Sequence, residues 1–372
     1  MFLDDSSSNL DPLPFPYLSA PPPSDLGSGA ETEDDIFSDC GSDDLNDPFE
    51  NDSRDDYVEP DPQVKGIIQT YLASVKENLV KEIKNQKMPN CYKAKTFWIN
   101  PPDHFFALKK SQESSDGLNP TALYYPKIFV WLPEFLDDSV ITCQNHECCH
   151  FQDTLHPMGI KGWNDNPIAR RIIGLDQNYF IITKRVRCRP ENSGCGKTFN
   201  FYDPVILDQL DPTLVAEFPA FLTHRSGIDK TLMTLIRAGI AHRLSSSAWS
   251  KVLREIHVCE HDLREVKYLQ AIRKEIKFKT NHGYEMSSYQ PFSNFDNQSE
   301  YAGFYPSRWY INSIYMDYME HIRPALDQCL AALTGYVIKW DHSFKLVKYM
   351  MKLNGTVTFA ALFTLVNEFE QI

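Results

Sequence analysis

Apolar residues recur three or four positions apart in several stretches of the chain, which is the spacing of one face of an α-helix. The first stretch follows Asp61-Pro62, a pair typical of a helix N-terminus, and ends near Pro89. The same period returns at residues 205–218, at residues 232–244, after a predicted N-cap at Ser247, and at residues 309–333. The turns within residues 204–280 are compatible with a helix-turn-helix, although periodicity alone favours a plain helical bundle.

β-Branched and aromatic residues dominate other segments, which the sequence predicts to be strands. Residues 95–99 and 127–131 are two of them. Residues 168–175 and 179–188 flank a short turn and predict a hairpin. Together with the helices, these strands predict an α+β fold.

The C-terminal residues also have a strand pattern. Residues 335–348 alternate between apolar and polar side chains, and a second apolar run covers residues 356–366 after the turn signal Asn354-Gly355. We therefore expect an antiparallel hairpin whose first arm carries Asp341. A carboxylate in this position can be a Mg²⁺ ligand, or it can be a solvated side chain at a strand end.

The residues around Asp341 resemble the opening strands of the RNase H-like catalytic domain of transposon-derived proteins. The resemblance rests on Asp341-His-Ser-Phe-Lys345, Lys348, Gly355, Phe359-Ala-Ala-Leu362, Thr364 and Asn367-Glu368. It implies that Asp341 is the first of three acidic ligands for two metal ions. The other two carboxylates have no counterpart before Ile372, so we expect a truncated and catalytically inactive domain. The alternative is a Mg²⁺-dependent transposase or nuclease that sequence outside this chain completes.

The charge is concentrated at the N-terminus. Residues 1–60 contain 17 Asp and Glu against one Arg, a net charge of 1 − 17 = −16, whereas the whole chain carries −13. Residues 61–372 therefore carry −13 + 16 = +3. The acidity of the chain belongs to its N-terminal tail and does not exclude binding to nucleic acid.

This acidic tail has too few apolar residues to offset the entropy of the chain, so we expect it to be disordered. Its scattered Phe, Leu and Ile residues suggest a segment that binds a protein partner, and a merely solubilising tail is the alternative. The tail lacks the features of a signal peptide, and no apolar run is long enough for a membrane span. We expect a nuclear or cytoplasmic protein that is not secreted.

Nine cysteines, an odd number, argue against a disulfide framework. The spacings Cys143-x4-Cys148 and Cys188-x6-Cys195 predict a zinc-ribbon-like site with structural zinc, and Gly194 and Gly196 relieve crowding around Cys195. Buried, unligated thiols are the alternative. Three further residues compete as ligands: His146, Cys149 and His150.

Positively charged residues cover the predicted hairpin that leads into the second cysteine pair. They can neutralise phosphates, so we expect DNA binding, with a solvated sheet face as the alternative. The residues are Arg170, Arg171, Lys184, Arg185, Arg187 and Arg189.

Residues 95–260 resemble an uncharacterised family of domains of unknown function, found beside transposase or exonuclease domains, notably in fungi. The most specific part is Arg225-Ser-Gly-Ile-Asp229, preceded by His224. The residues of this family motif are His224, Arg225, Ser226, Gly227 and Asp229. The first cysteine spacing is wider than the Cys-x2-Cys of that family, so the identity of the second ligand stays open.

The patterns divide the chain into six predicted parts. These are a disordered tail (1–60), a helix with strands (61–135), a zinc-ribbon-like β module (136–203), a helical module (204–280), a linker (281–299), and a helix with the first strands of a truncated RNase H-like domain (300–372). We expect a transposon-derived nucleic-acid-binding protein without catalytic activity. The alternatives are the Mg²⁺-dependent enzyme and a protein-interaction scaffold.

Overall fold

The computed structural model describes residues 66–113, 117–190, 193–285, 288–331, 339–343, 352–353, 356–357 and 362–366. The acidic tail predicted to be disordered lies outside these residues, as does the turn Asn354-Gly355. The described residues fall into two compact units that divide at Glu320, and each is described by itself. No described helix combines the length and the apolar content that crossing a membrane requires.

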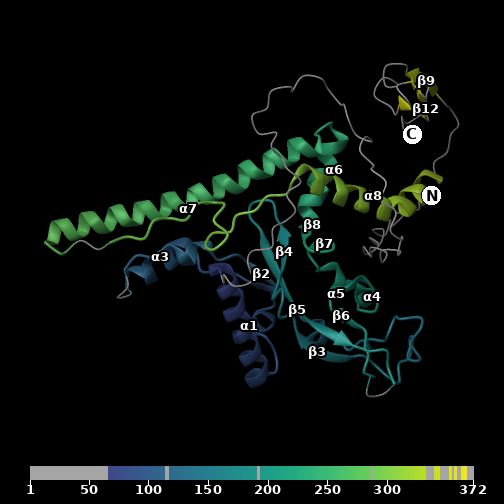
Figure 1. Cartoon of the computed structure of the whole chain (residues 1–372), viewed down its shortest axis with the longest axis horizontal. Coiled ribbons are helices and arrows are strands. Elements are labelled where there is room, and N and C mark those ends of the chain that lie inside the picture. Colours follow the sequence, from purple (N-terminus) through teal and green to yellow (C-terminus); the bar gives the residue numbers. More distant parts are fainter. Residues whose placement is uncertain are drawn as a thin grey trace, which may run out of the picture. The chain divides into compact units, whose positions relative to one another are not determined.

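A mixed β-sheet forms the centre of the first unit (Figure 1). Its strands lie in the order β1 (Trp98–Ile99), β2 (Ile128–Trp131), β5 (Tyr179–Arg187), β4 (Arg170–Ile173), β8 (Gly227–Asp229) and β7 (Ala220–Leu222). β5 pairs with β2 in parallel and with β4 in the antiparallel sense, and β4 pairs in parallel with β8. The far end of β5 pairs with β3 (Gly159–Trp163) and β6 (Thr198–Asn200), both antiparallel. Sheet and helices together confirm the predicted α+β fold.

Apolar side chains cover both faces of the sheet, because β2 and most of β5 are buried throughout. On one face, α1 (Ile67–Gln86) contributes residues three or four positions apart, such as Leu72, Val75 and Leu79. On the other face, Trp131 packs among aromatic rings, and its indole Nε1 donates to the backbone oxygen of Phe201 at 3.1 Å. The sheet is therefore the middle layer between two apolar clusters.

Several predicted elements are confirmed. The hairpin of residues 168–188 is present as β4 and β5, and the two upstream strands are β1 and β2, which pair antiparallel. α1 is the first predicted helix; it begins after an extended Gly66, whereas the predicted start at Asp61-Pro62 lies outside the described residues. Smaller helical elements are α2 (Asn90–Lys93), α3 (His104–Gln112), η1 (Thr121–Tyr124) and η2 (Pro133–Phe135).

The predicted helical module contains two strands in addition to its helices. After α4 (Pro204–Leu207) and α5 (Pro212–Ala216), the chain enters β7 and β8, which extend the main sheet. Gly227 allows β8 to lie close to both β7 and β4. A Cβ at this position would lie 2.7 Å from the backbone oxygen of Phe221 on β7 and 2.8 Å from the side chain of Ile172 on β4. Close packing between neighbouring strands thus overrides the helical period of the flanking segments.

Two helices follow β8. α6 (Lys230–Ala241) is capped by Asp229, whose carboxylate accepts from the backbone of Thr231 at 2.8 Å. α7 (Ser246–His282) is a helix of 37 residues. Its N-cap is Ser245, which corrects the predicted cap at Ser247: the hydroxyl of Ser245 accepts from the backbone N–H of Ala248 at 3.1 Å.

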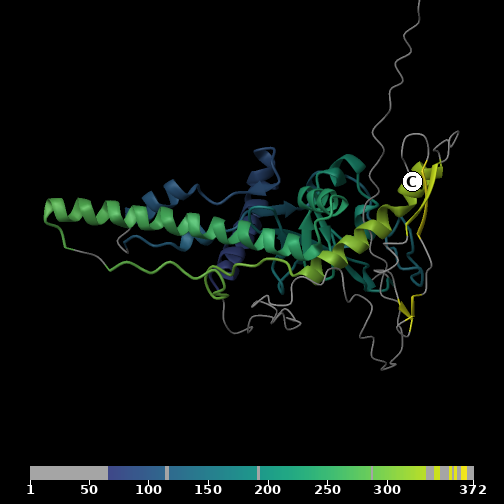
Figure 2. The ribbon, with the colours of Figure 1, turned by 90° about the horizontal axis from the view of Figure 1, so that it is seen from above.

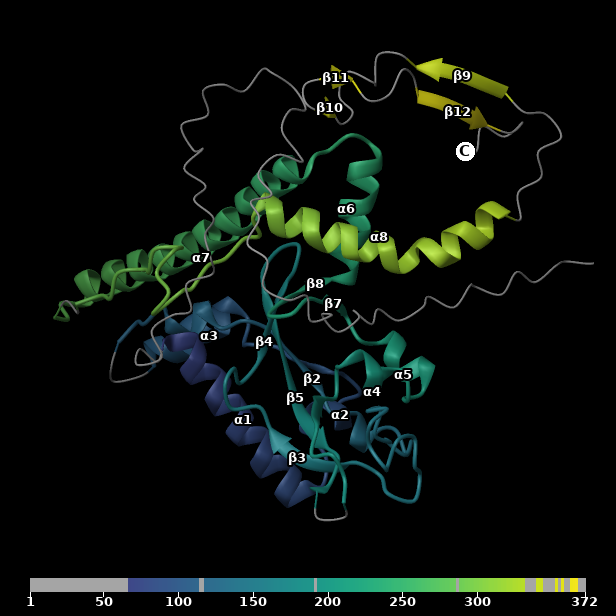
Figure 3. The same ribbon diagram turned by 45° about the vertical axis from the view of Figure 1, so that its right-hand side comes forward.

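The predicted helix near the C-terminus is confirmed as α8 (Arg308–Ala331), and its first half buries Ile311 and Ile314 in the first unit. In the second unit, β9 (Lys339–Ser343) pairs antiparallel with β12 (Leu362–Val366), which confirms the predicted pairing of the two arms (Figure 3). The second arm is divided, since β11 (Thr356–Val357) pairs instead with β10 (Lys352–Leu353). The single predicted strand of residues 356–366 is therefore two strands.

Candidate metal centre

Four cysteines from two distant segments meet next to the far end of β5. Sγ of Cys143 lies 3.7 Å from Sγ of Cys195, and Sγ of Cys148 lies 3.7 Å from Sγ of Cys188. All four sulfur atoms lie within 4.8 Å of one another. Three of the cysteines are buried, and Cys195 is exposed. This cluster can hold a metal ion.

The first segment forms a tight loop that turns both of its sulfurs inward. The backbone N–H of Cys148 donates to the oxygen of Asn145 at 2.9 Å, and that of Gln152 donates to the oxygen of Cys143 at 2.9 Å. Cys143 also forms a parallel bridge with Phe151. The spacing of four intervening residues is therefore accommodated by a closed loop.

Glycines allow the second segment to turn back on itself. A Cβ on Gly194 would lie 2.5 Å from the backbone oxygen of Arg189 and 2.6 Å from Sγ of Cys188. Gly196 has a φ of +72°, in the left-handed region. Gly194 therefore relieves crowding at Cys188, and Gly196 allows the left-handed turn after Cys195.

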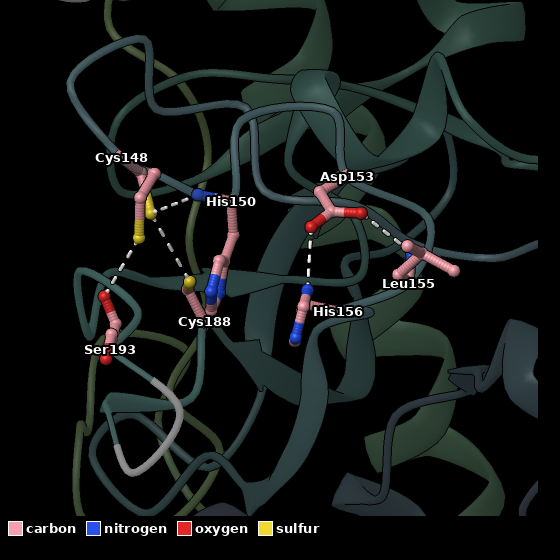
Figure 4. Close-up of polar contacts among 8 residues, drawn as sticks. Cys148, His150, Asp153, Leu155, His156, Cys188 and Ser193 are labelled. Atoms are coloured by element: carbon pink, nitrogen blue, oxygen red, sulfur yellow. Dashed lines mark hydrogen bonds and ion pairs between the residues drawn. The ribbon is translucent and has the colours of Figure 1, made fainter.

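The thiols differ in their electrostatic surroundings. The backbone N–H of His150 points at Sγ of Cys148 from 3.4 Å and lowers the pKa of this thiol to about 7 (Figure 4). Burial raises the pKa of Cys143 to about 12 and also raises the pKa of Cys188. Only a cation among the sulfurs would favour four thiolates in so buried a place.

The three competing ligands point elsewhere. Sγ of Cys149 donates to the backbone oxygen of Ser193 at 3.1 Å. The imidazole of His150 stacks on that of His156, with ring centroids 4.4 Å apart (Figure 4). The His146 ring packs against that of Phe151. None of the three belongs to the described group of four close sulfur ligands.

The six basic residues of the hairpin do not share one surface. Arg189 is exposed, whereas the other five are buried or partly buried. Nε of Arg170 donates to the backbone oxygen of Ser226 at 3.1 Å, and the guanidinium of Arg171 lies 5.0 Å from the ring centroid of Phe304. Arg170 and Arg171 therefore hold other segments against the sheet.

Lys184 forms a buried ion pair. Its Nζ lies 2.9 Å from Oε1 of Glu134, and the two side chains are only 11% and 13% exposed. The ammonium also lies over the rings of Phe135 and Trp163. Burial raises the pKa of Glu134, and the charge of Lys184 opposes this shift. The structure thus separates Lys184 from the basic residues at the surface.

A basic face remains on the sheet formed by β3, β5 and β6. Arg185 and Arg187 lie two residues apart on β5 and stand opposite Gly162 and Gly159 on β3. Their guanidiniums are partly buried and donate to the backbone oxygens of Trp163 at 3.0 Å and Gly196 at 3.2 Å. The Nζ of Lys161 lies 3.4 Å from the hydroxyl of Thr198, which stands opposite Arg187 on β6, so this lysine reaches the same face. We call Lys161, Arg185 and Arg187 the β3–β5–β6 basic face.

The motif residues of the resemblance hold the β7–β8 turn and the start of α6. His224 and Arg225 are exposed, and the hydroxyl of Ser226 donates to that of Tyr310 at 3.0 Å. The carboxylate of Asp229 accepts from the hydroxyl of Tyr179 at 3.0 Å in addition to capping α6. These contacts stabilise the β7–β8 turn and the start of α6.

Sequence reasoning missed both Glu134 and Lys161. The two-residue period of β5 carried a usable signal, because it places Lys184 on the side of Phe180 and Ile182, which pack with α1, and Arg185 on the other side. Asp341 lies in β9, opposite Thr364 on β12.

A family model described as a domain of unknown function, DUF6729, matches residues 69–315, more than half of the chain. The match begins in α1 and ends in α8, so it is wider than the resemblance found in residues 95–260. A search of curated proteins found no match. A search of solved structures also found none.

Proposed function

The chain belongs to the DUF6729 family of domains of unknown function, and we propose that it is a zinc-stabilised nucleic-acid-binding protein. The observation that carries the proposal is that the cysteine cluster adjoins the β3–β5–β6 basic face: Cys188 directly follows Arg187, the last residue of β5. A metal at the cysteines fixes the end of the strand that presents these charges. The free thiols suit a reducing compartment, the nucleus or the cytoplasm.

The spacing of the sulfurs supports zinc as the metal. Zinc binds thiolates tetrahedrally at about 2.3 Å, so neighbouring sulfurs of such a site lie about 3.8 Å apart. The two short separations in the cluster are each 3.7 Å. Four thiolates without an open position suit a structural ion rather than a catalytic one.

The β3–β5–β6 basic face supports phosphate binding. Two guanidiniums and one ammonium lie on neighbouring strands. The space above Gly162, opposite Arg185, is open, and the guanidinium of Arg189 lies over Gly159, opposite Arg187. Asp165, whose pKa the charge of Arg185 helps to lower, lies 2.6 Å from Nζ of Lys76 and is neutralised by it. The face therefore has a net positive charge, as DNA binding requires.

We expect the full chain to bind duplex DNA with a steep salt dependence. Arg185→Ala/Arg187→Ala should lower the slope of log affinity against log salt by about 2, since each lost phosphate contact removes about 0.9. Fluorescence anisotropy with a labelled duplex at several salt concentrations measures this slope.

The matched control is Lys81→Ala/Lys84→Ala, which removes two exposed charges from α1, the helix that packs on the opposite face of the sheet. This variant should bind as the wild type does. Equal losses in both double variants, or no binding at low salt, would contradict the proposal.

We also propose, as the sequence resemblance implies, that the protein derives from a transposon like the fungal proteins it resembles, and that residues 339–366 correspond to the first strands of an RNase H-like sheet. The antiparallel pairing of β9 with β12 supports this proposal. In the resemblance, Asp341 is the one metal-binding carboxylate that the chain matches.

Asp341 should not support cleavage in this chain. Two Mg²⁺ ions about 4 Å apart need several fixed oxygens to offset their mutual repulsion, and one carboxylate does not provide them. We expect nuclease and strand-transfer assays with Mg²⁺ or Mn²⁺ to give background signals, equal for the wild type and Asp341→Ala. Reproducible cleavage that Asp341→Ala abolishes would establish the enzyme instead.

A further inference from the structure

The outer face of α3 exposes two adjacent aromatic rings. Phe105 and Phe106 are 67% and 62% exposed, and their rings meet edge to face at a centroid distance of 5.5 Å. Lys109 and Lys110 are exposed one helical turn later, on the same side. Adjacent large apolar side chains so open to water mark a candidate contact surface for a partner.

α3 lies against the long helix α7 (Figures 1 and 2). Ala107 and Leu108 pack on the buried Tyr268 of α7. Nδ1 of His104 lies 3.0 Å from Nζ of Lys267, and burial together with nearby positive charges lowers the pKa of His104. The neutral imidazole accepts from the ammonium, which fixes Lys267 beside α3.

The helical period extends the same side of α7 towards its C-terminal end. Lys274 lies seven residues, or two turns, after Lys267, and Phe278 follows one turn later. Phe278 is 55% exposed, and its ring lies 6.2 Å from that of the exposed Tyr284. Lys267 and Phe278 are separated by about 16 Å along the helix axis. Exposed aromatic rings and lysines therefore occur together on the outer face of α3 and along one side of α7, and the contact of His104 with Lys267 joins the two helices.

We propose that this surface, formed by Phe105, Phe106, Lys109 and Lys110 of α3 with Lys267, Lys274 and Phe278 of α7, binds single-stranded nucleic acid. The proposal deepens the proposed function and rests on it. Unpaired bases stack on exposed aromatic rings, and lysines between the rings neutralise the phosphates that link the bases. A duplex keeps its bases stacked on one another, so it cannot use these rings.

Charge supports this occupant. The seven residues of the surface include four lysines and no acid. Two of the neighbouring acids on α7 are paired, Glu260 with Arg264 at 2.9 Å and Glu275 with Lys279 at 2.7 Å, and residues 263–282 of α7 contain six Lys and Arg against two acids. Asp103 and Glu113 flank α3 at its two ends and leave the outer face basic. An anionic lipid surface offers the same charge, but it favours a continuous apolar stripe, which the interposed lysines interrupt here.

The test compares a fluorescein-labelled oligothymidylate of about 20 nucleotides with a duplex of equal length, using the full chain and fluorescence anisotropy. Phe105→Ala/Phe106→Ala should weaken binding to the single strand by about 30-fold or more, because it removes two base stacks of about 1–3 kcal/mol each, and should leave duplex binding unchanged. Lys109→Ala/Lys110→Ala should weaken the single-strand complex and lower its salt slope. Trp309→Ala, which removes an aromatic ring that is 56% exposed on α8, is the matched control and should change neither.

The outcomes separate this inference from the proposed function. If the duplex binds through Arg185 and Arg187 while the single strand binds equally well to the phenylalanine variant, only the inference on α3 and α7 is wrong. If neither probe binds, both are wrong. If the phenylalanine variant instead loses sedimentation with phosphatidylserine vesicles and keeps its affinity for the single strand, the surface is a lipid-binding one and the inference is overturned.

Discussion

Cys188→Ser is expected to release the metal and unfold the β3–β5–β6 end of the protein. Metal binding supplies folding energy where the site exists only in the folded chain, about 10–16 kcal/mol in small zinc domains. Cys188 is 2% exposed and leads directly out of β5, so a lost ligand leaves a buried defect in the core. We expect about one zinc per wild-type chain, much less in the variant, and a lower Tm.

The matched control is Cys259→Ser, which changes an exposed thiol on α7 outside the cluster. It should keep both the metal and the Tm. A chelator should lower the Tm of the wild type and of this control to that of Cys188→Ser. A metal-free wild-type protein whose melting the chelator does not change would show that the cysteines are unligated thiols.

Lys184→Ala should destabilise the protein by about 3–5 kcal/mol, because it leaves the buried Glu134 without its counter-charge. Desolvation already raises the pKa of Glu134 in the folded state, and loss of the ammonium raises it further. A carboxyl whose folded pKa is raised contributes most stability when protonated, and this contribution is lost as pH rises through the folded pKa. The deficit should therefore be larger at neutral pH than in acid, as urea unfolding at several pH values would show.

The double variant Lys184→Met/Glu134→Leu should recover most of the loss, since apolar residues of similar volume often replace a buried ion pair without cost. Arg189→Ala, which removes an exposed charge from the same hairpin, should change stability little. Equal stability of Lys184→Ala and the wild type at neutral pH would contradict a buried pair.

The elements that sequence reasoning predicted well are those set by local patterns. α1 follows from a helical period, and the hairpin of β4 and β5 follows from two apolar runs around a short turn. The four cysteines were identified from their spacing, and the structure brings their sulfurs together. In each case, neighbouring residues carry the whole signal.

Features that depend on distant partners could not be predicted in this way. The short strands β7 and β8 exist because β4 offers them an edge, and the flanking residues have a helical period. Lys184 was grouped with its basic neighbours because Glu134, the residue that neutralises it, lies 50 positions earlier in the sequence. The number of charged residues along a strand does not reveal which of them form buried ion pairs in the folded protein.

The two cysteine pairs have a consequence for the unfolded chain. Cys148 and Cys188 are separated by 39 residues, which include all of β3, β4 and β5. A metal ion that joins both pairs acts as a cross-link and closes this loop, which removes conformational entropy from the unfolded ensemble by about 4 kcal/mol in the same way as a disulfide. Unlike a disulfide, this cross-link needs no oxidising environment and is reversed by acid, because protons compete with the metal for the thiolates.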